Sequence, residues 1–310
     1  MKNVIKHKIP TSHEEWLENR FKGIGGSDAG AILGLNPYKS PYALWCEKTG
    51  RIHNDVDNEA MRIGRDLEDY VAKRFCEETG KKVKKSNYSY QSKKYPFMLA
   101  NVDRLVSGED AILECKTTNM LTKTKYDKGD IPASYYAQCM HYMAVTGCRK
   151  AYIAILVLGK GFYYFEVNRD EEEIQSLIES EEAFWEDVQS DTEPEVDGSS
   201  STSDALDGMY SNSVNNEAIE LFGMESKVAQ YVDINSRIKT LEKEKKSLEN
   251  ELKHDLGECE NGYTDSFYVT WKSVSSSRLD SKLVKEKYPE VYTECLKEST
   301  SRRFGIKEIK

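Results

Sequence analysis

Signals for a membrane span or for export are missing from this chain. The sequence has no uninterrupted apolar run of the length that a transmembrane helix needs, about 18 residues or more. Its first residues, MKNVIKHKIPTSHEEW, contain no apolar stretch of the kind found in signal peptides. We therefore expect a protein without a membrane partner.

Clustered cysteine and histidine are missing as well. The seven cysteines are scattered and form no CxxC pair, and the five histidines include no HxxxH. These spacings argue against a disulfide framework, a zinc site or a cysteine-held iron–sulfur cluster. They indicate mostly buried free thiols in a reducing cytoplasm.

An overall positive charge, which many nucleic-acid-binding proteins carry, is also absent. The net charge is −9, but most of the acid lies in Glu166–Asp197, which holds 14 acidic residues and one arginine. Residues 1–100 carry a net charge of +5. A local basic face is therefore compatible with the composition, and Lys81–Lys94 is the candidate for it; a solvated edge is the alternative.

Helical and strand patterns alternate through residues 1–193 and predict one α/β domain, a mixed central sheet flanked by helices. GIGGSDAGAILG (23–34) reads as a glycine-rich turn that leads into a helix, and glycines close three other helical segments. The other predicted helices are 13–21, 40–50, 58–80, 132–147 and 170–189, and the predicted strands lie in 88–92, 97–106, 111–118 and 150–168.

The rest of the chain predicts a separate part. Residues 194–213 are rich in Ser and Asp, with little to bury, and predict a linker. Residues 214–310 follow, beginning with a long helix from Asn215 to about Leu256 whose apolar residues recur every seven positions. This pattern predicts a coiled-coil-like helical arm, followed by a small α+β tail with a strand, a helix and a second strand.

A charged pair stands out in the predicted strand AILECKTT (111–118). Because strand side chains alternate between faces, Glu114 and Lys116 should lie on one face and Cys115 on the other. A charged pair on an apolar strand costs desolvation energy unless something offsets it. The pair alone is weak evidence for a site, since surface strands often carry such residues.

Asp103 lies eleven residues before Glu114, and SGED reads as a turn that would pair the two strands. The two carboxylates should then meet at one end of the sheet, where they repel each other unless a divalent cation lies between them. Oxygen ligands suit Mg²⁺ or Mn²⁺. The sequence therefore predicts a metal site in which Lys116 orients a water molecule or neutralises charge on a phosphodiester.

D-(x)n-E-x-K on adjacent strands resembles the PD-(D/E)XK nuclease superfamily. Five motifs in order resemble its phage lambda exonuclease branch, also called YqaJ-type viral recombinases, over the first 190 residues or so. These motifs are RFKGIGGSDAGAILGLNPYKSPYALW, GRDLEDYVAKRF, ANVDRLV, LECKT and YYAQCMHYMAVTG. The resemblance implies a restriction-endonuclease-like core. The first acid follows Asn-Val instead of the proline of the superfamily's name.

The resemblance also implies roles for individual residues. One or two Mg²⁺ ions, which Mn²⁺ could replace, would be bound by Asp103, Glu114 and the backbone carbonyl of Cys115. Glu68 would complete the coordination shell of the metal. Lys116 would position or activate the attacking water with the help of Gln138. The residues implied to bind DNA are Arg20 and Ser27, which would grip a phosphate, and Trp16, which could stack on a terminal base.

The implied activity is 5′-3′ exonuclease digestion of linear double-stranded DNA ends, which leaves 3′ overhangs for phage-type recombination. The implied partners are a single-strand annealing protein and further copies of the chain in a ring, a trimer in the lambda type. The implied location is the bacterial cytoplasm, with the chain encoded by a phage or prophage. A structure-specific endonuclease and an inactive DNA-binding adaptor are the alternatives.

Overall fold

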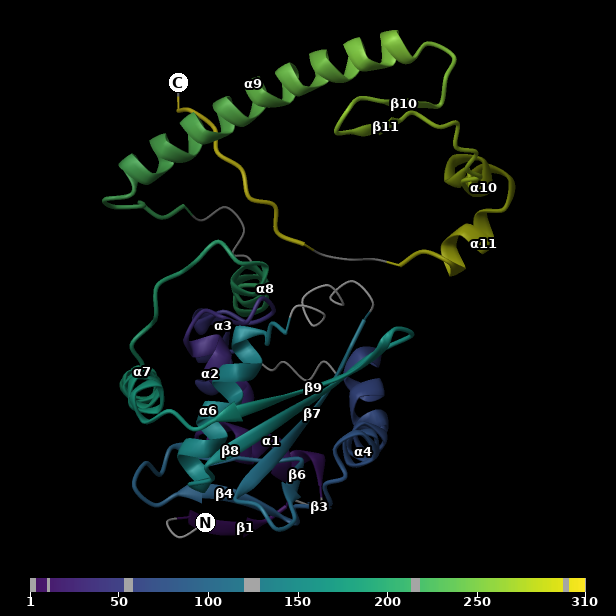
Figure 1. Ribbon diagram of the computed structural model, residues 1–310. Helices are drawn as coiled ribbons and strands as arrows, with labels where there is room; N and C mark the ends of the chain where they lie inside the picture. The colour runs from purple at the N-terminus through teal and green to yellow at the C-terminus, as the bar shows by residue number, and fades with distance from the viewer. Residues whose placement is uncertain are drawn as a thin grey trace. The chain divides into compact units, whose positions relative to one another are not determined.

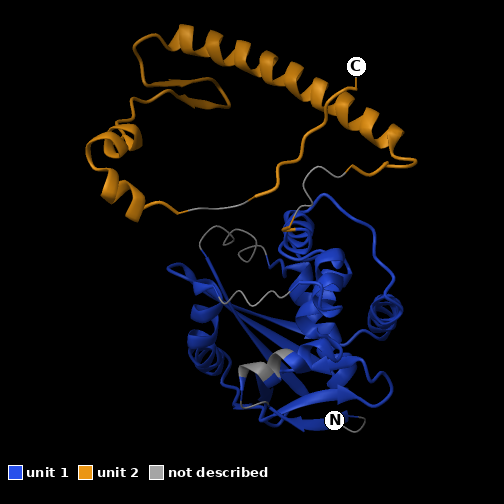
Figure 2. Cartoon of the chain, turned by 180° about the vertical axis from the view of Figure 1, so that it is seen from behind, with its two compact units in different colours: residues 1–210 blue, residues 211–310 orange. Residues whose placement is uncertain are grey.

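The computed structural model describes residues 4–9, 12–52, 58–119, 129–212, 218–297 and 301–309. The chain forms two compact units, residues 1–210 and residues 211–310 (Figure 2). Each unit is described separately below. Within the described ranges, no helix combines the length and the hydrophobicity that crossing a membrane requires.

A five-stranded mixed sheet is the centre of the first unit (Figure 1). The order of its described strands is β3-β6-β7-β8-β9, and among these only β7 and β8 run parallel. The strands are β3 (Val83–Lys85), β6 (Arg104–Val106), β7 (Ala111–Thr118), β8 (Lys150–Val157) and β9 (Gly161–Asn168). The β8–β9 hairpin and the antiparallel β6–β7 pair were both predicted from the sequence, and both are confirmed.

A second sheet has four strands in the order β1-β4-β5-β2. Its members are β1 (Val4–Lys8), β2 (Ile24–Gly25), β4 (Tyr88–Ser92) and β5 (Met98–Ala100). The predicted strand in 97–106 is therefore two strands, β5 and β6, which belong to different sheets. The break between them contains Asn101 and Asp103, so the predicted metal ligand lies at the junction of the two sheets. β1 and β3 were not predicted.

Helices α4 (Glu59–Thr79) and α6 (Ala133–Thr146) cover opposite faces of the five-stranded sheet (Figure 1). Leu113 of β7 packs with Phe75 of α4, whereas Ile112 packs with Met143 of α6. The alternation predicted for this strand is confirmed. Glu114 and Lys116 consequently lie on the face that α6 covers.

Five further helices of the first unit lie in the described ranges. Four of them are α1 (His13–Phe21), α2 (Gly26–Ile32), α3 (Pro41–Lys48) and α7 (Glu171–Ser190), and the fifth, α8, is described below. α2 lies directly against α6, and a Cβ atom added to Gly26 would come within 2.3 Å of the Tyr142 ring. Glycine at this position therefore allows the glycine-rich turn to approach the helix that carries Gln138.

The predicted linker, 194–213, is wrong over half of its length. Residues Ser200–Met209 form helix α8, which packs on α3. The Oγ of Ser201 accepts a hydrogen bond of 2.9 Å from the backbone N–H of Ser40, and Thr202 is completely buried. Local composition indicated a solvated segment because the partners of these hydroxyl groups lie about 160 residues away in the sequence.

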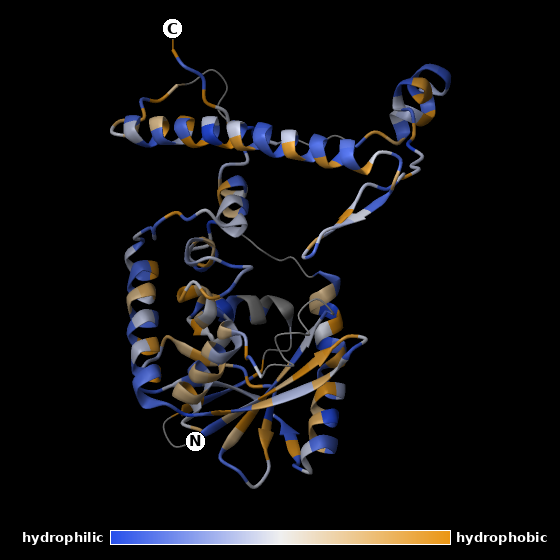
Figure 3. Ribbon diagram, turned by 45° about the horizontal axis from the view of Figure 1, so that its top comes forward, coloured by the Kyte–Doolittle hydropathy of each residue, from blue (hydrophilic) through white to orange (hydrophobic). Residues whose placement is uncertain are grey.

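The second unit contains the long helix α9 (Glu225–Leu256), which buries none of its residues. The helix was predicted to begin at Asn215, but it begins after Gly223, whose φ of 74° is incompatible with a helix. Figure 3 shows apolar residues recurring along a largely hydrophilic α9. The remaining elements are β10 (Asn261–Tyr263), β11 (Tyr268–Thr270), α10 (Ser281–Lys287) and α11 (Pro289–Glu294). The predicted closing strand is absent from 301–309.

Candidate active site

The register of β6 and β7 brings Asp103 to Glu114. Arg104 pairs with Leu113, so the residue before β6 lies beside the residue that follows Leu113. The backbone N–H of Cys115 donates a 2.8 Å hydrogen bond to Asp103 Oδ2, which fixes that carboxylate at the strand. The predicted meeting of the two acids at the end of the strand pair is therefore what the structure shows.

Glu114 is 4% exposed and has two partners on one oxygen. Its Oε1 accepts a 2.7 Å hydrogen bond from Gln138 Nε2 and lies 2.8 Å from Lys116 Nζ. Its Oε2 is buried and has no hydrogen-bond partner among the described residues. A buried carboxylate oxygen without a partner is costly, so this atom is available to a ligand such as a cation.

Electrostatics at the pair indicate an excess of negative charge. Burial and the neighbouring Glu114 carboxylate raise the pKa of Asp103 well above its usual value, although the N–H of Cys115 opposes the shift. Like charges at close range disfavour ionisation of both groups. A divalent cation would remove this penalty, so the donor set of two carboxylates fits Mg²⁺ or Mn²⁺.

Lys116 is held as an ammonium beside this pair. Burial opposes its charged form, but the Glu114 carboxylate outweighs burial and raises the pKa of Lys116 above its usual value. The ammonium nitrogen also lies 5.1 Å from the centre of the Tyr135 ring, at the start of α6. Lys116 is therefore placed to stabilise negative charge, and Glu114 and Tyr135 restrict its position.

Glu68 has a different neighbour from the one predicted. Its Oε1 accepts a 2.5 Å hydrogen bond from Arg104 and is 3.9 Å from Lys85 Nζ. Within the described ranges, no three Asp, Glu, His or Cys side chains lie close enough to hold a metal ion. The structure thus brings Asp103 and Glu114 together and leaves Glu68 bound to Arg104, near enough to contribute to the raised pKa of Asp103.

Arg104 was missed by the sequence analysis. It is 4% exposed, and it donates to Glu68, to Asp69 and, over 2.7 Å, to the backbone carbonyl of Asp103. The predicted pairing of the two strands was the available signal, because it places Arg104 opposite Leu113. Both side chains then face α4, which carries Glu68 and Asp69. Arg104 therefore connects α4 to the start of β6, where Asp103 lies.

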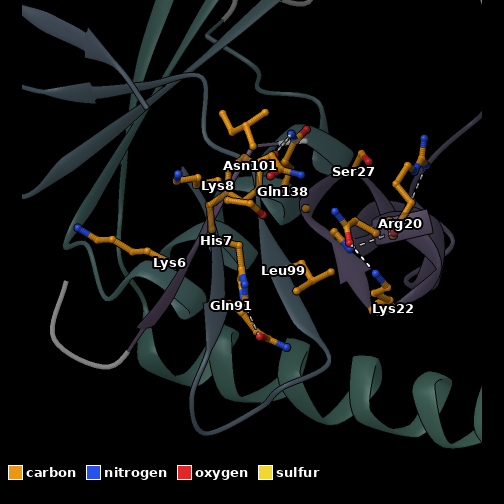
Figure 4. Close-up of a pocket in the computed structure, with 18 of the residues that line it drawn as sticks. Lys6, His7, Lys8, Arg20, Lys22, Ser27, Gln91, Leu99, Asn101 and Gln138 are labelled. Carbon is orange, nitrogen blue, oxygen red and sulfur yellow. Dashed lines mark hydrogen bonds and ion pairs between the residues drawn. The ribbon is translucent and has the colours of Figure 1, made fainter. Parts of the chain in front are cut away.

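A cleft of about 820 Å³ adjoins Gln138 and Tyr142. Figure 4 shows Arg20, Lys22 and Ser27 on one side of it, Lys6, His7 and Lys8 on the other, and Asn101 and Gln138 between. Arg20 and Ser27 thus share one cleft, as their predicted common role requires. Arg20 lies 3.7 Å from Asp28 and 3.3 Å from Glu47, and Ser27 is exposed near the start of α2. Trp16 belongs to α1, but its side chain lies outside the described part of the structure.

The lysines singled out in the sequence, Lys81–Lys94, do not line this cleft. Lys81 pairs with Glu109, and Lys94 lies over the Tyr95 ring. The cleft instead takes its cations from β1, from the C-terminal end of α1 and from α3. The signal for β1 was VIKHK, in which two β-branched residues precede two lysines that are spaced two positions apart, as on one face of a strand.

Asp28 is a structural acid at the floor of the cleft. It is buried, lies 2.7 Å from Lys48 Nζ, and accepts a 3.0 Å hydrogen bond from the N–H of Gly25. Burial alone would raise its pKa, but Lys48 and Arg20 outweigh burial and lower the pKa to about 2. Asp28 was not among the predicted site residues. Its contacts with Lys48 and Gly25 show that it anchors the glycine-rich turn.

We expect Asp28→Asn to lower the free energy of unfolding by about 3 kcal/mol at neutral pH, because it leaves the buried Lys48 ammonium without its counter-charge. An acid with a lowered pKa stabilises the fold above its unfolded pKa and loses that effect as the pH falls through its folded pKa. The difference from wild type should therefore shrink from about pH 4 towards pH 2. Urea unfolding curves at several pH values measure this. Asp66→Asn, at an exposed acid of α4, is the control, and an equal loss in both variants would contradict the assignment.

Known proteins share the sequence family and the fold of this chain. Residues 15–149 match the YqaJ-like viral recombinase domain. The chain is 43% identical to the uncharacterized protein YqaJ of Bacillus subtilis (strain 168), over 99% of this chain and 98% of that protein. It also resembles the crystal structure of an alkaline exonuclease from Laribacter hongkongensis, with a TM-score of 0.50 and 21% identity over 57% of this chain and 93% of the other.

The likeness to the exonuclease shows a common fold, and the predicted restriction-endonuclease-like core is confirmed. The likeness to YqaJ extends over nearly the whole chain, including the second unit. The chain belongs to the YqaJ-like viral recombinase family.

Proposed function

We propose that this protein is a metal-dependent deoxyribonuclease, a 5′-3′ exonuclease that acts on linear double-stranded DNA ends and leaves 3′ overhangs for recombination by strand annealing. The observation that carries the proposal is the cluster of Asp103, Glu114, Lys116 and Gln138, in which one buried oxygen of Glu114 has no partner among the described residues. The family and the exonuclease-like fold support it.

Asp103, Glu114 and the backbone carbonyl of Cys115 would hold Mg²⁺, which Mn²⁺ could replace. When bound, the cation supplies positive charge and lowers the pKa of a coordinated water. Glu68 would coordinate the metal only if its hydrogen bond with Arg104 were broken. The direction of digestion, the number of metal ions and the identity of the metal are part of the proposal, and they are inferred from the family.

The chain's own residues supply the remaining functions. The Lys116 ammonium would stabilise the charge that develops on the scissile phosphate, because it is fixed beside Glu114 before the substrate arrives. Gln138 holds Glu114 through its amide, which fixes the direction of that carboxylate. Arg20 and Ser27 would bind the 5′ phosphate of the strand being digested, from the cleft that adjoins Gln138.

Linear duplex DNA labelled at one end, with and without a 5′ phosphate, tests this proposal. In the presence of Mg²⁺ we expect stepwise loss of nucleotides from the 5′ end and faster digestion when the 5′ phosphate is present. Covalently closed circular DNA is the control and should stay intact. Cleavage of the circle would indicate an endonuclease, and no cleavage of either DNA with Mg²⁺ or Mn²⁺ would indicate a DNA-binding adaptor.

We also propose that the protein acts as a ring-shaped homo-oligomer, with a trimer favoured, and that a single-strand annealing protein receives its product. The exposed apolar residues that repeat along α9 make the second unit a candidate for either contact. Light scattering on the purified full-length chain tests the first idea, and a monomeric mass at the concentrations used for digestion would contradict it.

A further inference from the structure

One wall of the cleft is the edge strand β1. In the described part of the chain this strand pairs only with β4 and lies at the edge of its sheet, and its side chains from Ile5 to Lys8 are exposed. Lys6 and Lys8 are exposed and line the cleft, and they project from the same face of the strand because strand side chains repeat every second residue. His7, between them, reaches across to Gln91, with 2.9 Å between His7 Nε2 and Gln91 Oε1.

The lining of the cleft is strongly cationic. It contains five Lys or Arg side chains and a single acid, Asp28. Lys48 already neutralises Asp28 at 2.7 Å, and Arg20 shares Asp28 and Glu47. Lys6, Lys8 and Lys22 have no acidic partner among the described residues: Lys22 bonds Asn19, and Lys6 lies 5.5 Å from the Tyr88 ring centre. Three positive charges on the two walls therefore remain for an anionic ligand.

The size of the cleft selects among anionic ligands. Its volume of about 820 Å³ lies within the range of pockets that hold small molecules, about 300–1,000 Å³. Such a space takes a short length of one nucleic-acid strand and is too small for a duplex. Polar groups on its walls, including Ser89 and Asn101, could contact sugar or base atoms of that strand.

We propose that Lys6 and Lys8 of β1 bind successive backbone phosphates of a single DNA strand that enters the cleft, opposite the Arg20–Ser27 side. This inference rests on the proposed function for the identity of the ligand as DNA. β1 is then a wall that holds the unpaired end of a strand against the site formed by Asp103, Glu114 and Lys116. The lysines that mark this role lie outside the family's matched region, residues 15–149.

The test is binding of a fluorescent, 5′-phosphorylated single-stranded oligothymidylate to the full-length protein, with Ca²⁺ in place of Mg²⁺ to prevent cleavage. We expect the double variant Lys6→Gln/Lys8→Gln to bind several-fold more weakly. Its plot of log affinity against log salt should be less steep by about 1.4, since each lost phosphate contact on a single strand contributes about 0.7. Fluorescence anisotropy at several salt concentrations provides both quantities.

Two matched variants make the test specific. Lys93→Gln/Lys94→Gln removes the same charge at exposed lysines that directly follow β4 and lie outside the cleft, and we expect it to retain the wild-type salt slope. Lys6→Arg/Lys8→Arg keeps the charge and should keep the slope, which separates a lost contact from a damaged strand. An unchanged slope in Lys6→Gln/Lys8→Gln, or an equal change in Lys93→Gln/Lys94→Gln, would overturn the inference.

The outcome is distinguishable from failure of the proposed function, because binding is measured without cleavage. A protein that cuts no DNA but loses single-strand affinity in Lys6→Gln/Lys8→Gln would contradict the nuclease proposal and support the role of β1. If the wild type digests linear DNA and Lys6→Gln/Lys8→Gln binds the single strand normally, the nuclease proposal is supported and the role of β1 is contradicted.

Discussion

Lys116→Ala should lower the rate of DNA cleavage by about two to three orders of magnitude, the usual effect of removing one fixed charge that stabilises a transition state. The structure supports a large effect because the ammonium is placed in advance, 2.8 Å from Glu114 and over the Tyr135 ring. Among the described residues, no other Lys or Arg side chain pairs with Glu114 and could replace it.

The measurement is single-turnover digestion of linear duplex DNA by wild type and Lys116→Ala, with Mn²⁺ binding followed by calorimetry. We expect binding of Mn²⁺ to persist, since both carboxylates remain. Lys116→Arg is the matched control: it keeps the charge, but its planar guanidinium fits the space differently, so a partial loss of rate is expected. A cleavage rate that Lys116→Ala leaves unchanged would show that the catalytic assignment is wrong.

The face that carries the chemistry could be predicted because it depends on local rules. Strand alternation placed Glu114 and Lys116 together, and a short turn between two strands placed Asp103 beside them. Both rules act over a few residues, so one sequence is enough to apply them. The resemblance to a family then supplied Gln138, whose 2.7 Å hydrogen bond to Glu114 depends on a helix more than twenty residues away.

The environment of the site could not be predicted in the same way. Arg104, β1 and α8 owe their roles to partners distant in the chain: Glu68, β4 and α3. His141 is a further case. It is fully buried between Glu181 and the Leu99 carbonyl, at 2.7 Å and 2.8 Å, and both partners lie about 40 residues away in the sequence. Local composition does not reveal such pairings, because they form only when distant parts of the chain pack together.

Arg104→Gln should have two effects of opposite kind. It removes a buried guanidinium that bonds Glu68, Asp69 and the Asp103 carbonyl, so we expect the free energy of unfolding to fall by about 3 kcal/mol. It also releases Glu68 and removes a positive charge near Asp103 and Glu114. The site then becomes more negative, so Mn²⁺ should bind several-fold more tightly.

Urea unfolding and calorimetric titration with Mn²⁺ measure the two effects on the same protein. Arg62→Gln is the matched control on α4, where an exposed arginine lies 3.8 Å from Glu59, and its stability should change by no more than about 0.5 kcal/mol. Adding Glu68→Gln to Arg104→Gln should reduce the gain in Mn²⁺ affinity, because it removes the released carboxylate and leaves only the effect of the lost positive charge. If Arg104→Gln binds Mn²⁺ as wild type does, Glu68 is no part of the cation site, and the arginine serves only to join α4 to the sheet.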